Sequence, residues 1–386
     1  MKKTFILAAA ALCTLLALAS CDKNKNDGPK DETVVIPEVR AQGLYYGDFN
    51  GNGTGNVLLT LVKGDFSVGY DYDEDGYPIA FCTGTGFNLN LDFNMPFDED
   101  SDHAKLVPGV YTAGDDVTFA EGTWNRGEWM SLYQEGKDGE FTVDGYLADG
   151  TLTIEEVKGG YKITFDGSLE DGTKVKVSTV WEGHLIADTE DTLYSNLDKD
   201  LKLTTLVKGN FVNFGDPSYE GLVDRLAIVL ADRHYDLEAD RGMGDYVYIY
   251  LNVEPGSEGI PTDVYSSWIL DDDPSNPASS KPGDINVGCM IWGALYGGCW
   301  YFNPIKGYEV ALVDGYLDIE ALGGDKYKVS GELIDPYGKK LTISYNGLLP
   351  EVIRENNDEE GELSVKSQNR VPNFYTRFSA TRMSRK

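Results

Sequence analysis

Histidine is scarce in this chain, and the residue spacings of common catalytic and metal sites are missing. The sequence has 3 histidines in 386 residues. It contains no HExxH, no GxSxG and no zinc-ligand spacing, which argues against a zinc enzyme or a serine hydrolase. Carboxylates are plentiful and need no motif, so a hydrolase that uses a carboxylate pair stays open as an alternative. We therefore expect no enzyme, and we name no catalytic residue.

Basic residues are also few. The chain has 33 Lys and Arg against 64 Asp and Glu, which gives a formal net charge of −31. A surface of this sign repels phosphate backbones and anionic lipid headgroups. The composition therefore argues against nucleic acid as a partner and against adsorption to an acidic membrane surface.

Long segments with the helical period of 3.6 residues are absent after the first 20 residues. Short stretches instead alternate apolar with polar residues, for example Leu152 and Ile154, then Ile163 and Phe165. Such alternation, with glycine-rich connections, predicts short antiparallel strands that bury one face. We expect an all-β protein of antiparallel β-sandwich domains, with β-barrel domains as the alternative.

The first 21 residues have the pattern of an export signal. Lys2 and Lys3 precede an apolar run at residues 5–19 that is too short for a permanent membrane span. The run ends in Leu18-Ala19-Ser20-Cys21, which resembles the lipobox of bacterial lipoproteins. The resemblance implies a signal peptide at residues 1–20, cleavage before Cys21 and acylation of Cys21. The alternative is an ordinary signal peptide that is cleaved elsewhere.

Residues 21–40 are charged and contain proline and glycine, which is typical of a disordered tether. The acidic and lysine residues directly after Cys21 also resemble the export signals of Bacteroidota surface lipoproteins. That resemblance implies a lipid anchor in the outer membrane and display at the cell surface. Lipoproteins of this kind commonly bind glycans, peptides or other outer-membrane proteins.

The rest of the chain is doubled. Four blocks of sequence match in the same order, which is the signature of a repeated domain. The blocks are residues 87–93 with 247–253, 106–113 with 259–267, 122–129 with 293–300, and 149–163 with 314–329. We predict copy one at residues 41–187, a polar linker at 188–203 and copy two at 204–350. Residues 351–386 predict a disordered tail.

Two local patterns indicate further sites. Asp71, Asp73 and Asp75 precede Gly76 in the alternation of the first half of an EF-hand loop, which makes them a candidate Ca²⁺ site. The alternative is an ordinary β-turn, because Cys82 stands where the loop needs a glutamate. Cys289 and Cys299 flank MIWGALYGG and are a candidate disulfide across a hairpin of an exported chain. No other cofactor is expected.

The matched strands differ on one face. Residues 87–93 alternate apolar residues with Asn and Asp, whereas the second copy places Tyr246, Tyr248 and Tyr250 on that phase. If the other phase forms the core, these tyrosines form an exposed ladder that suits stacking on sugar rings or a protein interface. The alternative is that a loop or the neighbouring domain covers them.

These observations predict a lipid-anchored binding protein of the cell surface, with glycan binding by the tyrosines of the second copy as the leading hypothesis. A structural or adhesive lipoprotein without a small ligand, which binds another outer-membrane protein, is the first alternative. A surface hydrolase is the second.

Overall fold

A computed structural model describes residues 38–72, 78–115, 117–127, 130–189, 193–216, 221–238, 241–270, 280–291, 294–295 and 297–352. The expected signal peptide, Cys21, residues 22–37 of the tether and residues 353–386 of the tail lie outside these ranges. The described residues form strands and one 3-10 turn, η1 (Ser101–His103). No helix among them is both long and apolar enough to cross a membrane. The all-β prediction is therefore confirmed.

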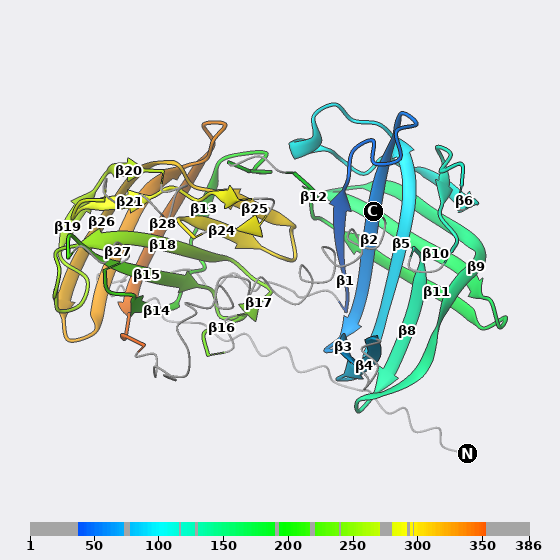
Figure 1. Ribbon diagram of the computed structural model, residues 1–386, viewed down its shortest axis with the longest axis horizontal. Coiled ribbons are helices and arrows are strands. Elements are labelled where there is room, and N and C mark those ends of the chain that lie inside the picture. Colours follow the sequence, from blue (N-terminus) through cyan, green and yellow to red (C-terminus); the bar gives the residue numbers. More distant parts are fainter. Residues whose placement is uncertain are drawn as a thin grey trace, which may run out of the picture.

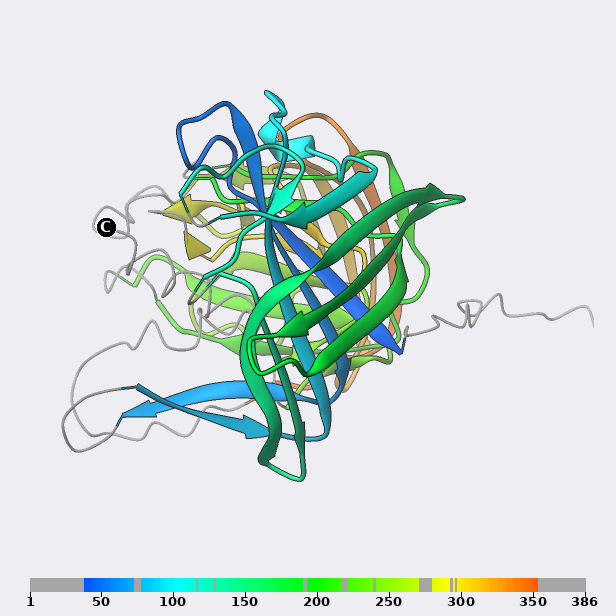
Figure 2. The same cartoon turned by 90° about the vertical axis from the view of Figure 1, so that its right-hand side faces the viewer.

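The first domain is a single large sheet that curls round its own core (Figures 1 and 2). Its strands are β1 (Val39–Tyr45), β2 (Thr54–Gly64), β3 (Ser67–Tyr72), β4 (Pro78–Thr83), β5 (Gly86–Pro96), β6 (Gly109–Ala113), β7 (Thr123–Trp124), β8 (Leu132–Lys137), β9 (Glu140–Val157), β10 (Gly160–Leu169), β11 (Lys174–Trp181) and β12 (Leu185–Ala187). The sheet order is β11-β10-β9-β6-β7-β5-β2-β1-β12, and β8 pairs with both β5 and β9. Strands β3 and β4 form a separate hairpin.

The second domain packs two separate sheets face to face. Its strands are β13 (Leu201–Leu203), β14 (Lys208–Asn213), β15 (Asp224–Ala231), β16 (Tyr235–Asp236), β17 (Arg241–Gly242), β18 (Tyr246–Val253), β19 (Asp263–Tyr265), β20 (Ser267–Ile269), β21 (Asp284–Asn286), β22 (Met290–Ile291), β23 (Ala294–Leu295), β24 (Trp300–Asn303), β25 (Tyr308–Ala311), β26 (Asp314–Gly323), β27 (Lys326–Ile334) and β28 (Lys340–Leu348). One sheet has the order β13-β28-β27-β26-β19. The other has the order β14-β15-β18-β21-β20, and β24 joins β18 to β25.

The period of two in the sequence explains where the cores lie. Leu89 and Leu91 of β5 point into the core of the first domain, and Ile249 and Leu251 of β18 point into the core of the second. All four are fully buried. Burial of a leucine or isoleucine side chain is worth roughly 1.5 to 3 kcal/mol. A register shift of one residue in either strand would turn these side chains out of the core and lose that free energy.

The two domains repeat the same contacts at matched positions. The Tyr111 hydroxyl donates to the Val107 carbonyl (2.7 Å), and the Tyr265 hydroxyl donates to the Pro261 carbonyl (3.0 Å), four residues back in both cases. Tyr111 pairs with Leu152 across β6 and β9, and Tyr265 pairs with Leu317 across β19 and β26. These contacts recur at positions that the sequence repeat pairs, although the strands form one large sheet in the first domain and two in the second.

Tryptophan positions correct one part of the sequence alignment. The Trp124 indole donates to the Gly150 carbonyl (3.0 Å), and the Trp268 indole donates to the matching Gly315 carbonyl (2.9 Å). Trp124 and Trp268 are thus equivalent in structure, although the alignment places Trp300 opposite Trp129. Trp300 lies in β24 and Trp129 lies outside the described residues. The two glycine-rich blocks align because their compositions are similar, which does not require their tryptophans to be equivalent in structure. The indole hydrogen bond, by contrast, forms only at one position in the core.

The edges of the domains differ slightly from the expected boundaries. Strand β1 begins at Val39, so the last residues of the expected tether already belong to the sheet. Strand β12 runs parallel to β1. In the second domain, Glu351 forms a parallel bridge with Phe211 of β14, and the Val352 amide donates to the Phe211 carbonyl (2.8 Å). The first two residues of the expected tail therefore belong to the second domain.

Residues 194–197 of the segment expected as a polar linker are buried between the domains, whereas Asp188 and residues 198–200 are exposed. Tyr194 and Leu197 are fully buried, and Asn196 is nearly so. Tyr194 packs in an apolar cluster with Ile186 of the first domain and Phe302 of the second, and we call this set of contacts the interdomain cluster. The connection is therefore part of the packed interior and holds the two domains side by side (Figure 1).

Replacement of the matched tyrosines tests the structural repeat. Tyr111→Phe and Tyr265→Phe each remove one buried hydroxyl and leave a carbonyl without its donor, so each is expected to lower the free energy of unfolding by about 1 kcal/mol. The measurement is the urea unfolding midpoint. Tyr316→Phe is the control, because Tyr316 is 48% exposed. Equal midpoints for all three variants and the wild type would contradict the repeat of this contact.

Candidate functional site

The three tyrosines lie on the outer face of β18, as predicted, but they do not form an exposed ladder. Tyr246 is 3% exposed, and its ring stacks on Phe302 with the centroids 5.1 Å apart. The hydroxyls of Tyr248 and Tyr235 are hydrogen-bonded at 2.7 Å. The expected exposure is therefore wrong for Tyr246, and Tyr248 is half-buried. The alternative, coverage by a loop and the neighbouring domain, describes these two residues.

The cover over this face comes from both domains. The interdomain cluster joins Tyr246 and Tyr248 to Trp300 of β24, to Leu44 of β1 and to Ala187 of β12. Aromatic rings bury large apolar areas and favour tilted or offset contacts, as in this cluster. Their main role in the structure is to hold the domains together.

Tyr250 is half-buried, as Tyr248 is, but it lies beside an exposed ring. Its ring is parallel to that of Phe214, with an interplanar angle of 11° and centroids 6.2 Å apart. Phe214 follows β14 and is 41% exposed. Sequence reasoning missed Phe214, because it follows a strand distant in sequence that only sheet pairing brings near Tyr250. We call Phe214 and Tyr250 the aromatic pair.

A buried polar side chain follows the aromatic pair on the same face of β18. Asn252 lies two residues after Tyr250 and is fully buried. Its Oδ1 accepts a hydrogen bond from Arg225 Nε (3.1 Å), whereas its Nδ2 has no hydrogen-bond partner among the described residues. An unpaired buried amide donor costs about 1 to 3 kcal/mol, but this atom is closed to solvent, so it is not itself a ligand contact.

The same face of the first domain has a different chemistry. Asp92 matches Asn252 in the repeat and accepts hydrogen bonds from Asn56 Nδ2 (2.7 Å) and Asn125 Nδ2 (2.6 Å). These three side chains are buried, so the polar phase of β5 forms an internal network. The first domain therefore has no aromatic pair at this position, as the sequence contrast indicated.

The calcium prediction falls largely outside the described residues. Asp73 and Asp75 are not described, and Asp71 pairs with Ile79 at the end of β3. Within the described ranges, no group of three or more His, Cys, Asp and Glu side chains is arranged to hold a metal ion. The Asp71 loop stays a prediction.

The predicted disulfide is not formed in this structure, and Cys289 and Cys299 are both buried. Cys299 lies opposite Val287 in an isolated parallel bridge, and Val287 is two residues before Cys289. The Tyr250 amide donates to Cys299 Sγ (3.3 Å), and burial raises the pKa of this thiol to about 12.

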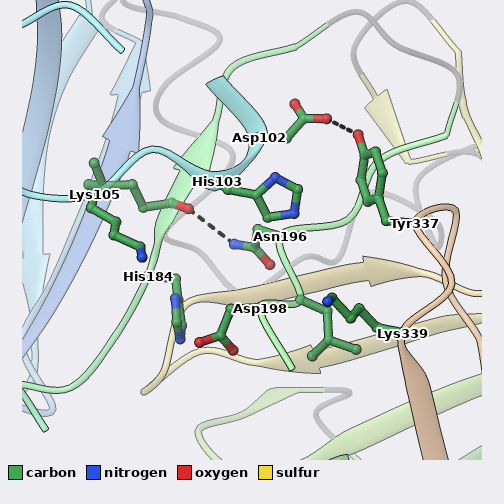
Figure 3. Close-up of a pocket in the computed structure, with 10 residues that line it drawn as sticks. Asp102, His103, Lys105, His184, Asn196, Asp198, Tyr337 and Lys339 are labelled. Carbon is green, nitrogen blue, oxygen red and sulfur yellow. Dashed lines mark hydrogen bonds between the residues drawn. The ribbon is translucent and has the colours of Figure 1, made fainter. Parts of the chain in front are cut away.

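A pocket of about 360 Å³ lies where the two domains meet (Figure 3). Its lining includes His103 and Lys105 after the acidic loop of the first domain, His184 before β12, and Tyr337 and Lys339 of the second domain. The buried segment between the domains contributes Asn196, Leu197 and Asp198. Sequence reasoning treated the three histidines as unrelated, yet two of them line this pocket.

Hydrogen bonds across the domain boundary shape the pocket. Asn196 Nδ2 donates to the carbonyls of Leu185 (3.1 Å) and Gly307 (2.7 Å), and its Oδ1 accepts from the Glu309 amide (2.9 Å). Gly307 has a φ of 64°, and a Cβ there would lie 2.3 Å from the His184 carbonyl oxygen. Glycine is required at this position because the two backbones touch.

The loop that carries Tyr337 and Lys339 is also held from the segment between the domains. Ser195 Oγ donates to Asp335 Oδ2 (2.6 Å), and Asp335 Oδ1 accepts from the amides of Tyr337 (3.0 Å) and Lys339 (2.7 Å). The Tyr337 hydroxyl then reaches across to Asp102, and its ring packs edge-on against His103 at 5.0 Å. The pocket wall is thus built from both domains.

Asn196→Ala tests the domain boundary. The change leaves two carbonyls and one amide unpaired in a buried region, so we expect a loss of roughly 3 to 5 kcal/mol in the free energy of unfolding. Urea titration followed by tryptophan fluorescence measures it. Asn346→Ala, at an exposed position of β28, is the control. A loss no larger than that of the control would show that these bonds do not hold the domains.

Comparison with known proteins adds no family to these observations. No protein-family model, no curated protein and no solved structure matches the chain. Its function therefore has to be argued from its own residues.

Proposed function

We propose that this chain is a lipid-anchored binding protein of the cell surface that takes a saccharide on the aromatic pair of its second domain. The observation that carries the proposal is the parallel arrangement of the exposed Phe214 ring and the half-buried Tyr250 ring. Aromatic rings at a surface stack against the apolar face of a sugar ring.

The neighbouring polar groups suit the same ligand. Arg225 lies across from Asn252 in the pairing of β15 and β18, and its Nη2 donates to Ser280 Oγ (3.5 Å). Guanidinium N–H groups supply directional hydrogen bonds that orient a polyhydroxylated ligand, and Arg225 is the half-buried member of this set, whereas Asn252 and Ser280 are buried. The strong negative charge of the chain disfavours nucleic acid as a ligand for the same aromatic surface.

The anchor is the second part of the proposal. The Leu18-Ala19-Ser20-Cys21 motif supports acylation of Cys21, and residues 22–37 connect the lipidated residue to the first domain. A saccharide receptor with such an anchor binds its ligand at the surface of the outer membrane, and its folded domains do not enter the bilayer. A structural or adhesive lipoprotein that binds another outer-membrane protein is the outcome if no glycan binds.

Glycan binding is tested with the lipid-free protein on a glycan array, followed by titration calorimetry on the best hit. Tyr250→Ala and Phe214→Ala are each expected to weaken binding roughly tenfold, by analogy with nucleic-acid bases, whose stacking on one aromatic side chain is worth about 1 to 3 kcal/mol. Tyr316→Ala and Phe97→Ala are matched controls, because they remove exposed aromatic rings elsewhere. Absence of any hit, or equal binding by all four variants, would refute the saccharide proposal.

The anchor is tested by Cys21→Ser. The variant is expected to lose incorporation of labelled fatty acid and to leave the outer-membrane fraction, because a single hydroxyl cannot take the place of the thiol that is acylated. The measurement is metabolic labelling with fractionation of the cells. Cys82→Ser is the control, since Cys82 is a buried thiol of the first domain. Unchanged labelling of Cys21→Ser would show that the lipid is elsewhere or absent.

A further inference from the structure

The interdomain pocket gathers cationic side chains in a strongly acidic chain. The sequence has about two acidic residues for each basic one, yet Lys105, Lys339, His103 and His184 line this one cavity. Lys105 comes from the first domain and Lys339 from the second, and Figure 3 shows the two side chains entering from opposite sides. Their convergence exists only when the two domains are packed together.

The carboxylates of the pocket already have hydrogen-bond donors. Asp102 accepts from the Tyr337 hydroxyl. Asp198 accepts from the Tyr308 hydroxyl (2.8 Å), and its other oxygen lies 3.9 Å from Lys199 Nζ. Among the described residues, by contrast, no carboxylate lies within 4.0 Å of the ammonium groups of Lys105 or Lys339. The ammonium groups of exposed Lys105 and half-buried Lys339 are therefore available to an added anion, whereas both carboxylates are already engaged.

The pKa of His184 depends on its burial and on the charged groups around the pocket. Its ring stacks on Tyr308 with the centroids 4.5 Å apart. Burial lowers the pKa of His184, and the charges of Lys199, Lys105 and Lys306 lower it further, while Asp198 opposes them. The imidazole is therefore neutral at pH 7, and it adds no competing positive charge that would need a partner of its own.

We propose that the interdomain pocket binds a small oxyanion, a ligand that presents a carboxylate, sulfate or phosphate group to Lys105 and Lys339. Ammonium groups form short, charge-assisted hydrogen bonds with such oxygens. The volume of about 360 Å³ accommodates an ion or a single acidic sugar and is at the small end of ligand pockets. Because the ligand contacts both domains, its binding also fastens them together. This proposal does not depend on saccharide binding at the aromatic pair.

The test is titration calorimetry of the lipid-free protein with sodium sulfate, sodium phosphate and sodium glucuronate. Sodium chloride holds the ionic strength constant, because screening alone weakens surface charge interactions. We expect at least one of the three anions to bind with one site per chain. The preferred anion then identifies the source of the oxyanion group, as an inorganic ion or an acidic sugar.

Matched lysine variants locate the site. Lys105→Ala and Lys339→Ala are each expected to weaken anion binding at least tenfold, and Lys105→Arg to retain it. Lys174→Ala and Lys328→Ala change the net charge equally at exposed positions of β11 and β27, and should bind as the wild type does. Absence of binding by all three anions, or equal binding by the pocket and control variants, would overturn the proposal.

The effect of pH gives a second readout with sulfate and glucuronate, whose charge is constant between pH 8 and pH 5. Protonation of His184 adds a positive charge beside Lys105, so affinity should rise as the pH falls through the pKa of His184. The rise should be smaller in His184→Gln. The other charged and titratable groups that face this ring or line the same pocket include Asp198, Lys199, Lys105, Lys306, Asp102 and His103. An affinity that falls toward pH 5 would contradict the assignment of His184 to the site.

Discussion

Burial of the segment between the two domains is the constraint on which the rest of the structure depends. Tyr194 fills the interdomain cluster, and Asn196 satisfies backbone groups of both domains at once. Polar backbone atoms buried without partners would be costly, so this one amide side chain decides how closely the domains approach. The pocket, the cover over Tyr246 and the position of the Tyr337 loop all follow from that approach.

The doubled domain shows which contacts a fold keeps and which it is free to change. The Tyr111 and Tyr265 hydroxyl bonds, and the indole bonds of Trp124 and Trp268, recur because each satisfies a buried carbonyl at the same point of the core. The outer faces carry no such requirement. One has become an amide and carboxylate network, and the other has become aromatic, and this divergence is what makes the second domain the candidate for ligand binding.

The sequence indicated only some of the residues of the candidate sites. Tyr250 stood out through its period-two spacing, but its partner Phe214 lies 36 residues earlier in a strand whose register no local pattern reveals. The histidines and lysines of the pocket are more scattered still, because they come from three separate segments between strands. The disulfide expectation failed for a related reason, since Cys289 and Cys299 are near in sequence but offset across a parallel bridge.

The sequence by itself determined the all-β class, the doubling and the buried phase of the central strands, since alternation of apolar residues acts locally and leaves one face of each strand to be buried. The same alternation says nothing about what covers the other face. Only the tertiary structure decided that Tyr246 is enclosed between the domains, that Tyr250 lies beside Phe214, and that Lys105 and Lys339 line one pocket. The physical reason is that these outcomes depend on packing between distant segments, whose relative position is set by the sum of many weak contacts and not by any local period.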